Sequence, residues 1–187
     1  MPSGNIPTSS LIVISYKSRY LYFHVRFIFD GTIFSGVMLL AGAVLRIRDT
    51  GSLAFEFIGL DGLSSWLIFL AIGVKCAFPL LHSWLVDGYP AATPTGTVFL
   101  SAFTTKAAVY ALARGFAGSE ILIYIGALMT CFPIFYAVIE NDLRRVLAYS
   151  MINQIGFMVC GVGVGTALAV NGAVAHAFND VFSRDCS

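Results

Sequence analysis

Charged side chains are scarce in this sequence. Lys, Arg, Asp and Glu make up only 11% of its 187 residues, whereas 58% of the residues are hydrophobic, and a typical soluble domain has about 25% charged residues. The eleven basic residues are dispersed and the net charge is +1, so the chain lacks the basic patch that nucleic-acid binding requires. These shortages exclude an ordinary soluble domain and a nucleic-acid-binding protein, and they indicate an integral membrane protein.

The sequence also lacks the motifs of bond-making chemistry. Its four cysteines form no CxxC or Cys/His spacing, and it has neither a nucleophile constellation nor a phosphate-binding glycine loop. Cysteines in apolar segments act as small hydrophobic residues. We therefore expect no metal site, no cofactor and no catalytic active site in this chain.

Most of the sequence consists of long apolar stretches that are separated by short polar ones. A bilayer core of about 30 Å needs about 20 apolar residues per helix, so the chain is long enough to cross a membrane about six times. The pattern predicts helices at about 30–47, 60–84, 95–113, 121–139, 144–164 and 166–182. The predicted fold class is an all-α, polytopic membrane helix bundle.

Several residues predict how these helices begin, break and pack. Pro79 interrupts the second helix, and proline removes a backbone donor, so we expect a kink or break there. Thr93-Pro94 favours the start of the third helix, and Asp142 that of the fifth. The many glycines at 156–172 predict close helix packing.

The predicted domain organisation has three parts. An N-terminal segment of undefined structure covers residues 1–29, a transmembrane domain covers 30–182, and a polar C-terminal tail covers 183–187. Short loops force consecutive helices to alternate in direction, so the basic residues at helix ends can be sorted onto two sides. The side with the N-terminus and the 142–145 loop carries a modest excess, which the positive-inside rule assigns to the cytoplasm.

Two lysines fall near the middle of predicted helices. Lys75 lies about fifteen residues into the second helix, and Lys106 lies about twelve residues into the third. A lysine at that depth costs roughly 2.5–3.5 kcal/mol and usually faces a bundle interior or an ion or proton pathway. Burial disfavours the charged ammonium, so such a lysine can gain and lose a proton. The alternative is that each helix is shifted and its lysine reaches an interface.

A histidine follows the first lysine at helical spacing. His82 comes seven residues after Lys75, which on a continuous helix is two turns and the same face. Pro79 between them would free backbone carbonyls, which are tolerated at membrane depth only against protein or water. The three residues together predict a hydrated polar spot, although His82 alone fits an interface residue equally well.

Hydroxyl groups surround the second lysine. Thr104 and Thr105 precede Lys106, and Tyr110 follows it by one turn on the same face. These groups are candidates to hold water or to extend a proton wire. Helix-packing hydroxyls are the equally weighted alternative.

Two further groups of polar residues lie on the last predicted helices. His176, Asn179 and Asp180 share a face of the sixth helix, and a histidine in an apolar segment is a relay candidate. On the fifth helix, Asn153 and Gln154 place amides toward neighbouring helices. We expect these amides to form interhelical hydrogen bonds.

Five blocks of sequence, in fixed order and spacing, carry a family resemblance: residues 73–87, 92–95, 105–114, 142–156 and 176–179. The chain resembles the antiporter-like proton-translocating subunits over about residues 30–182. That family includes the large D-type subunit of the Mrp cation/proton antiporters and the membrane-arm subunits of NADH:quinone oxidoreductase.

The resemblance implies a role in proton transport. It implies that Lys75 is the central proton-carrying lysine on a discontinuous helix, that Lys106 continues the relay, and that His176 lies further along it. It implies a subunit of a sodium/proton antiporter in the cell inner membrane, with other membrane subunits, lipid, protons and sodium as partners and without a cofactor. A proton-pumping subunit of NADH:quinone oxidoreductase fits the same motifs.

The sequence departs from this family in its length and in the segments near both of its ends. Family members have about fourteen helices, of which this chain would supply roughly the sixth to the eleventh. Residues 1–29 contain no glutamate to pair with the first lysine, and residues 181–187 turn polar where the family pattern continues through a phenylalanine-lysine step into an apolar helix. A truncated fragment that does not transport is therefore the third hypothesis.

Overall fold

A computed structural model describes residues 31–52 and 54–185, so the whole of the expected N-terminal segment 1–29, and Cys186, lie outside the described residues. The regular structure of the described part is entirely helical, which confirms the all-α prediction. In chain order the elements are Gly31–Thr50, α2 (Leu63–Lys75), α3 (Ser83–Ala91), α4 (Pro94–Phe99), the π-helix η1 (Leu100–Thr104), α5 (Thr105–Gly115), α6 (Glu120–Ile139), α7 (Leu143–Val164) and α8 (Ala167–Asp185).

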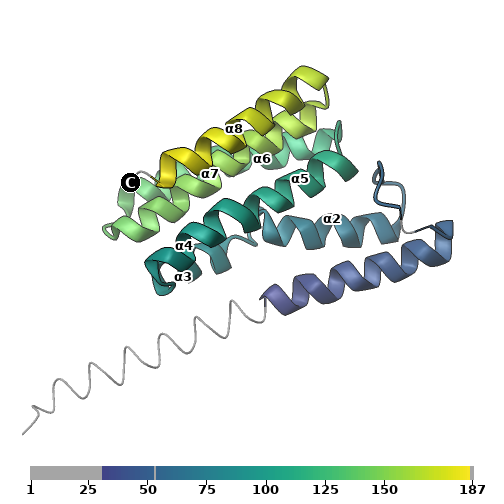
Figure 1. Cartoon of the computed structure of the whole chain (residues 1–187), viewed down its shortest axis with the longest axis horizontal. Helices are drawn as coiled ribbons and strands as arrows, with labels where there is room; N and C mark the ends of the chain where they lie inside the picture. Colours follow the sequence, from purple (N-terminus) through teal and green to yellow (C-terminus); the bar gives the residue numbers. More distant parts are fainter. Residues whose placement is uncertain (1–30, 53, 186–187) are drawn as a thin grey trace, which may run out of the picture.

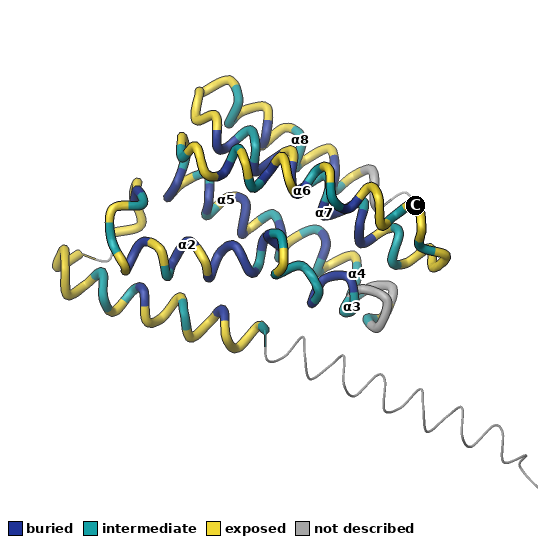
Figure 2. Tube along the Cα trace, turned by 180° about the vertical axis from the view of Figure 1, so that it is seen from behind, coloured by how far each residue is buried: buried dark blue, intermediate teal, exposed yellow. Residues whose placement is uncertain are grey.

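The helices are arranged as a layered bundle around α7. Helices α6, α7 and α8 pack together, α5 contacts both α2 and α7, and the helix Gly31–Thr50 runs beside α2 at the opposite edge (Figures 1 and 2). About half of α7 is buried, including Met151, Ile155 and Met158. Helix α7 is thus the scaffold that lies between α5 and α8.

Four of the described helices are long and apolar enough to cross a membrane: Gly31–Thr50, Gly96–Gly115, Glu120–Ile139 and Leu143–Val164. Helix α2 is apolar but has only 13 residues. Large apolar side chains such as Tyr124, Phe135 and Val138 are exposed on α6, as expected of a helix that faces lipid. The predicted six segments correspond to these four helices, the broken segment α2–α3, and α8.

The predicted caps are present where the sequence placed them. The Thr93 side chain accepts a hydrogen bond from the backbone N of Gly96 at 3.3 Å, and Asp142 accepts one from the backbone N of Arg144 at 3.1 Å. Helix α8 continues to Asp185, so the first residues of the expected polar tail 183–187 are helical. The side chains of Thr93 and Asp142 therefore cap the helices whose starts they predicted.

The second predicted helix is broken rather than kinked. Helix α2 ends at Lys75 and α3 begins only at Ser83. Between them Ala77 (φ 58°) and Leu80 (φ 72°) adopt the left-handed backbone conformation on either side of Pro79. That conformation costs an L-residue roughly 1–2 kcal/mol, so tertiary packing has to stabilise the break.

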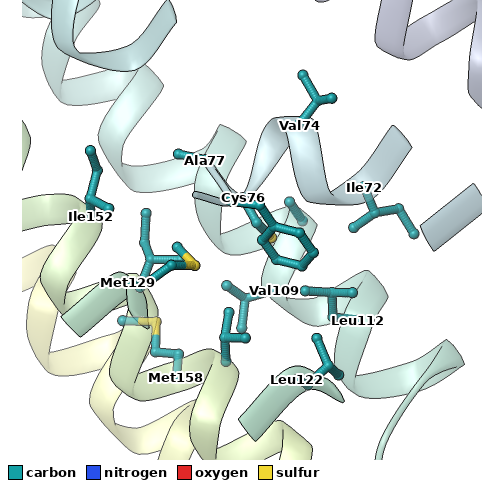
Figure 3. Packing of buried hydrophobic residues seen from close by; sticks show 14 of the residues in the cluster. Ile72, Val74, Cys76, Ala77, Val109, Leu112, Leu122, Met129, Ile152 and Met158 are labelled. Atoms are coloured by element: carbon teal, nitrogen blue, oxygen red, sulfur yellow. The ribbon is translucent and has the colours of Figure 1, made fainter. Parts of the chain in front are cut away.

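Packing around Phe78 supplies that stabilisation. The Phe78 side chain is buried, and its ring lies 5.5 Å from the Phe69 ring, centroid to centroid. Gly73 leaves the space for it, because a Cβ atom there would lie 2.5 Å from the Phe78 ring. Figure 3 shows Cys76 and Ala77 among buried side chains of the neighbouring helices. The break is therefore part of the hydrophobic core.

Glycines bring α6 and α7 close together. A Cβ atom at Gly156 would lie 2.9 Å from the backbone N of Thr130, and one at Gly163 would lie 2.7 Å from the backbone N of Ile123. The predicted close packing is confirmed at these two positions. It is wrong at Gly172 on α8, where a Cβ atom would meet nothing within 4 Å.

Candidate functional site

Lys106 on α5 forms an ion pair with Asp180 on α8. The Lys106 Nζ lies 2.6 Å from the Asp180 Oδ2 and also donates to the carbonyl O of Ser101 at 3.1 Å. The two side chains are 12% and 5% exposed. A buried ion pair offsets its desolvation cost only with close geometry and additional hydrogen bonds, and both conditions are met here.

A π-helical turn positions Lys106. The π-helix η1 (Leu100–Thr104) is followed directly by Thr105, and Thr105 directly precedes Lys106. The carbonyl O of Ser101 in this turn accepts from the Thr105 hydroxyl at 3.1 Å as well as from Lys106. Single π-helical turns inside helices occur frequently at functional sites. The turn thus provides the lysine with a backbone acceptor beside the carboxylate.

His176 on α8 contacts α7 through Gln154. Its Nε2 lies 2.6 Å from the Gln154 Oε1. An amide oxygen only accepts hydrogen bonds, so Nε2 carries the hydrogen in this arrangement. The contact confirms the expected interhelical role of Gln154, and it fixes the orientation of the imidazole ring.

An open groove of about 500 Å³ lies beside both pairs. It is lined by Gln154, His176, Asn179, Asp180 and Phe182. His176 and Asp180 are four residues apart on α8, which places them on one face of the helix. Lys106, Asp180 and His176 therefore follow one another along this side of the bundle.

Lys75 borders a different cavity of about 450 Å³, between the helix Gly31–Thr50, α2 and α5. Its polar lining consists of Thr32, Ser35, Lys75 and Thr104, and the remaining lining residues are glycine, alanine, leucine and isoleucine. Ser35 is only 2% exposed although most of its helix is exposed. This cavity is large enough for several water molecules, each of which occupies about 30 Å³ in the liquid.

Trp84 on α3 holds the end of α2. Its indole Nε1 donates to the carbonyl O of Val74 at 2.7 Å, and the Lys75 Nζ lies 5.8 Å from the centre of its ring. This distance is within the range of a cation–π interaction. Trp84 therefore connects the two halves of the broken helix and orients the lysine.

The two lysines lie on opposite sides of α5. Thr104, Ala107 and Ala108 face the Lys75 cavity, whereas Lys106 is directed toward Asp180. At 3.6 residues per turn, residue 106 projects away from the face that 104, 107 and 108 share. Lys75 and Lys106 therefore belong to two different sites, and α5 lies between these sites.

His82 does not share a helix face with Lys75, so that prediction is wrong. The helix ends at Lys75, and His82 lies in the connection that precedes Ser83. Its ring packs edge-on against Phe132 at 5.1 Å, and its Nδ1 is buried with no hydrogen-bond partner among the described residues. The left-handed residues of the break remove the helical register on which the expectation depended.

The other predicted supporting residues differ in their surroundings. Tyr110 is 61% exposed, and its hydroxyl accepts from Arg114 at 3.1 Å. Thr105 is fully buried and bonded to the helix backbone. Asn179 is exposed at the groove. Of the three, only Asn179 borders the space that contains Asp180.

Asp180 is the residue to which sequence reasoning assigned no role. The sequence placed it on the face of His176, and a lone acid in an apolar helix was the available signal. Its partner Lys106 is 74 residues away in the chain. Within residues 31–52 and 54–185, no group of three His, Cys, Asp or Glu residues lies together in a way that could hold a metal ion.

A family model described as "NADH:quinone oxidoreductase/Mrp antiporter, TM" matches residues 6–184 of this chain. The chain belongs to this family. The match begins upstream of residue 30, where the resemblance in the sequence began, and it includes most of the expected N-terminal segment. The chain is therefore a member of a membrane-spanning family.

Curated relatives carry the names of subunits of an F(420)H(2) dehydrogenase, a quinone oxidoreductase and an antiporter. F(420)H(2) dehydrogenase subunit L of Methanosarcina mazei is 32% identical over 95% of this chain and 26% of its own length. NADH-quinone oxidoreductase subunit N of Desulforudis audaxviator is 34% identical over 60% of this chain and 25% of its own. A Staphylococcus saprophyticus protein that carries the name antiporter subunit mnhD2 is 28% identical over 77% of this chain and 32% of its own.

A solved structure shares the fold. A chain of the Mrp complex from a Dietzia species superimposes with a TM-score of 0.78 at 23% identity, over 86% of this chain and 33% of that chain. At this level of identity the likeness establishes the fold. The chain spans about a quarter to a third of the length of the relatives it matches.

Proposed function

We propose that this chain is a proton-conducting subunit of a multi-subunit monovalent cation/proton antiporter, with sodium as the cation. The observation that carries the proposal is the buried ion pair of Lys106 and Asp180 beside His176, in a chain whose family includes Mrp antiporter subunits as well as NADH:quinone oxidoreductase subunits. Buried ionisable groups inside membrane helices characterise ion and proton pathways.

Lys75 and Lys106 carry protons in this proposal. Each ammonium is partly removed from water, Lys75 against the Trp84 ring and Lys106 against Asp180. In a low-dielectric interior, modest movements of a neighbouring charge decide whether such a group keeps its proton. A cation gradient or a movement of partner subunits would supply that change, and water in the Lys75 cavity would connect the lysine to its neighbours.

The proposed location is the cell inner membrane, with the N-terminus and the 142–145 loop in the cytoplasm. Arg144 and Arg145, in the first turn of α7, support this orientation through the positive-inside rule. Arg145 also lies 3.5 Å from Glu140, across the turn that connects α6 to α7. Other membrane subunits and lipid would cover the exposed apolar faces of the bundle.

Replacement of Lys75 tests the proposal. In membrane vesicles that contain the assembled complex, Lys75→Ala should abolish the sodium-induced collapse of a preset pH gradient. Leu70→Ala, at an exposed side chain of the same helix, should leave it intact. Antiport that survives Lys75→Ala at the level of Leu70→Ala would contradict the assignment.

The second candidate is a proton-pumping membrane subunit of NADH:quinone oxidoreductase. Relatives that carry that name, such as subunit N of Desulforudis audaxviator, favour it. Membranes from a deletion strain should then lose NADH-driven quinone reduction. Retention of that activity together with loss of antiport would select the antiporter, and loss of neither would select a fragment that does not transport.

A further inference from the structure

Asp180 is a buried acid that contacts Lys106 and shares a helix face with His176. Asp180 is 6% exposed on α8, with the Lys106 Nζ 2.6 Å from its Oδ2 and His176 one turn earlier on the same helix face. We infer that Asp180 is the proton carrier that connects Lys106 to His176, an inference that rests on the proposed function. Asp180 thereby becomes a member of the relay and more than a counter-ion.

The geometry favours direct transfer at the first step. At 2.6 Å the ammonium hydrogen of Lys106 already points to the carboxylate oxygen, within the short range of charge-assisted hydrogen bonds. The carbonyl O of Ser101, 3.1 Å from the same Nζ, holds the amine in place when the proton leaves. No rearrangement of the helices is required.

The step balances in atoms and charge. One N–H bond of the Lys106 ammonium breaks and one O–H bond forms on the Asp180 carboxylate, so a charged pair becomes a neutral amine and a neutral acid. The net charge of the pair is zero before and after. Since burial penalises both separated charges, the neutral pair is accessible in this site.

The second step crosses the groove. The acid proton of Asp180 passes to the imidazole of His176 through water, because the groove of about 500 Å³ that both residues line has room for it. Breaking the O–H bond restores the carboxylate, and the imidazole becomes an imidazolium. Gln154, whose Oε1 accepts from the His176 Nε2 at 2.6 Å, stabilises that cation.

Proton flux through the complex reconstituted in liposomes tests the inference. A potassium diffusion potential drives protons inward, and an enclosed pH-sensitive dye reports them. Asp180→Asn should lower the flux at least about tenfold, in line with the loss of a positioned proton-transfer group. Asp180→Glu should keep most of it, and the matched control Asp61→Asn, at an exposed acid, should leave it unchanged.

Comparison with Lys106→Ala distinguishes a failure of the role of Asp180 from a failure of proton conduction as a whole. Loss of flux in Lys106→Ala with full flux in Asp180→Asn would overturn the role of Asp180 and leave proton conduction intact. Absence of flux in the wild-type complex would overturn both. Loss of flux in Lys106→Ala and Asp180→Asn, with retention in Asp180→Glu, supports both.

Infrared spectroscopy covers the case in which Asp180→Asn does not assemble. In wild-type complex labelled with ¹³C-aspartate, conduction should be accompanied by an isotope-shifted band of a protonated carboxylic acid. In Asp180→Glu that band should lose its aspartate isotope shift. A purely structural carboxylate gives no such band, so its absence from the conducting wild-type complex would overturn the inference.

Discussion

The Lys106 ammonium and the Asp180 carboxylate lie 2.6 Å apart although 74 residues separate them in the chain. Their ion pair links α5 to α8, and α7 packs against both of these helices. It therefore contributes to the packing of the bundle as well as to its proposed chemistry. The two contributions can be separated by experiments on stability and on flux.

The stability of this pair depends on both partners being present. Lys106→Met alone should lower the free energy of unfolding by about 3–5 kcal/mol, because it leaves a buried carboxylate without its ammonium. The double variant Lys106→Met/Asp180→Leu should recover most of that loss. Thermal unfolding in detergent measures both, and a double variant no more stable than the single one would show that the pair is not coupled.

The indole of Trp84 should matter through its hydrogen bond as well as its ring. Trp84→Phe removes the buried bond to the Val74 carbonyl, which should cost about 1–2 kcal/mol of stability and partly reduce proton flux, because Lys75 is held less firmly. Trp66→Phe, the same change at an exposed side chain of α2, is the control. Equal effects of the two substitutions would speak against a positioning role for Trp84.

The Tyr110 hydroxyl should not take part in proton transport. It is exposed and bonded to Arg114, so Tyr110→Phe should leave the flux of the reconstituted complex within measurement error. If the hydroxyl groups near Lys106 instead formed a proton wire, which is one of the two alternatives in the sequence analysis, Tyr110→Phe should strongly decrease the proton flux. A decrease comparable to that of Lys106→Ala would favour the wire.

The packing of α6 on α7 should tolerate no side chain at Gly156. A Cβ atom there meets backbone atoms at about 3 Å, so Gly156→Ala should destabilise the bundle by about 1–3 kcal/mol. Gly172→Ala has open space around it and should be neutral or stabilise α8 by up to about 1 kcal/mol. Thermal unfolding should rank the two variants in this order, and the reverse order would be inconsistent with the close approach of α6 and α7.

Helix positions followed from the sequence because the signals are local. Apolar length defined α6 and α7 to within one residue, and the caps at Thr93 and Asp142 marked the starts of α4 and α7. The break at Pro79 was also predicted, but its extent was not. The left-handed conformations of Ala77 and Leu80 depend on tertiary packing around Phe78, which no local pattern specifies.

The candidate site was predictable only in part. Lys75 and Lys106 were identified as candidate site residues because a lysine near the middle of a membrane helix is energetically unfavourable. Helical spacing placed Asp180 on the same face as His176. The pairing of Lys106 with Asp180 depends on how α5 and α8 pack against α7, a non-local relationship. The separation of the two lysines by α5 likewise depends on which face of that helix meets which neighbour.

The most direct test of proton conduction through buried lysines is the flux of the reconstituted complex with and without Lys106. Under an imposed membrane potential, the wild-type complex should take up protons, and Lys106→Ala, assembled to the same level, should fall to the rate of protein-free liposomes. Wild-type flux in the Lys106→Ala complex would contradict the account.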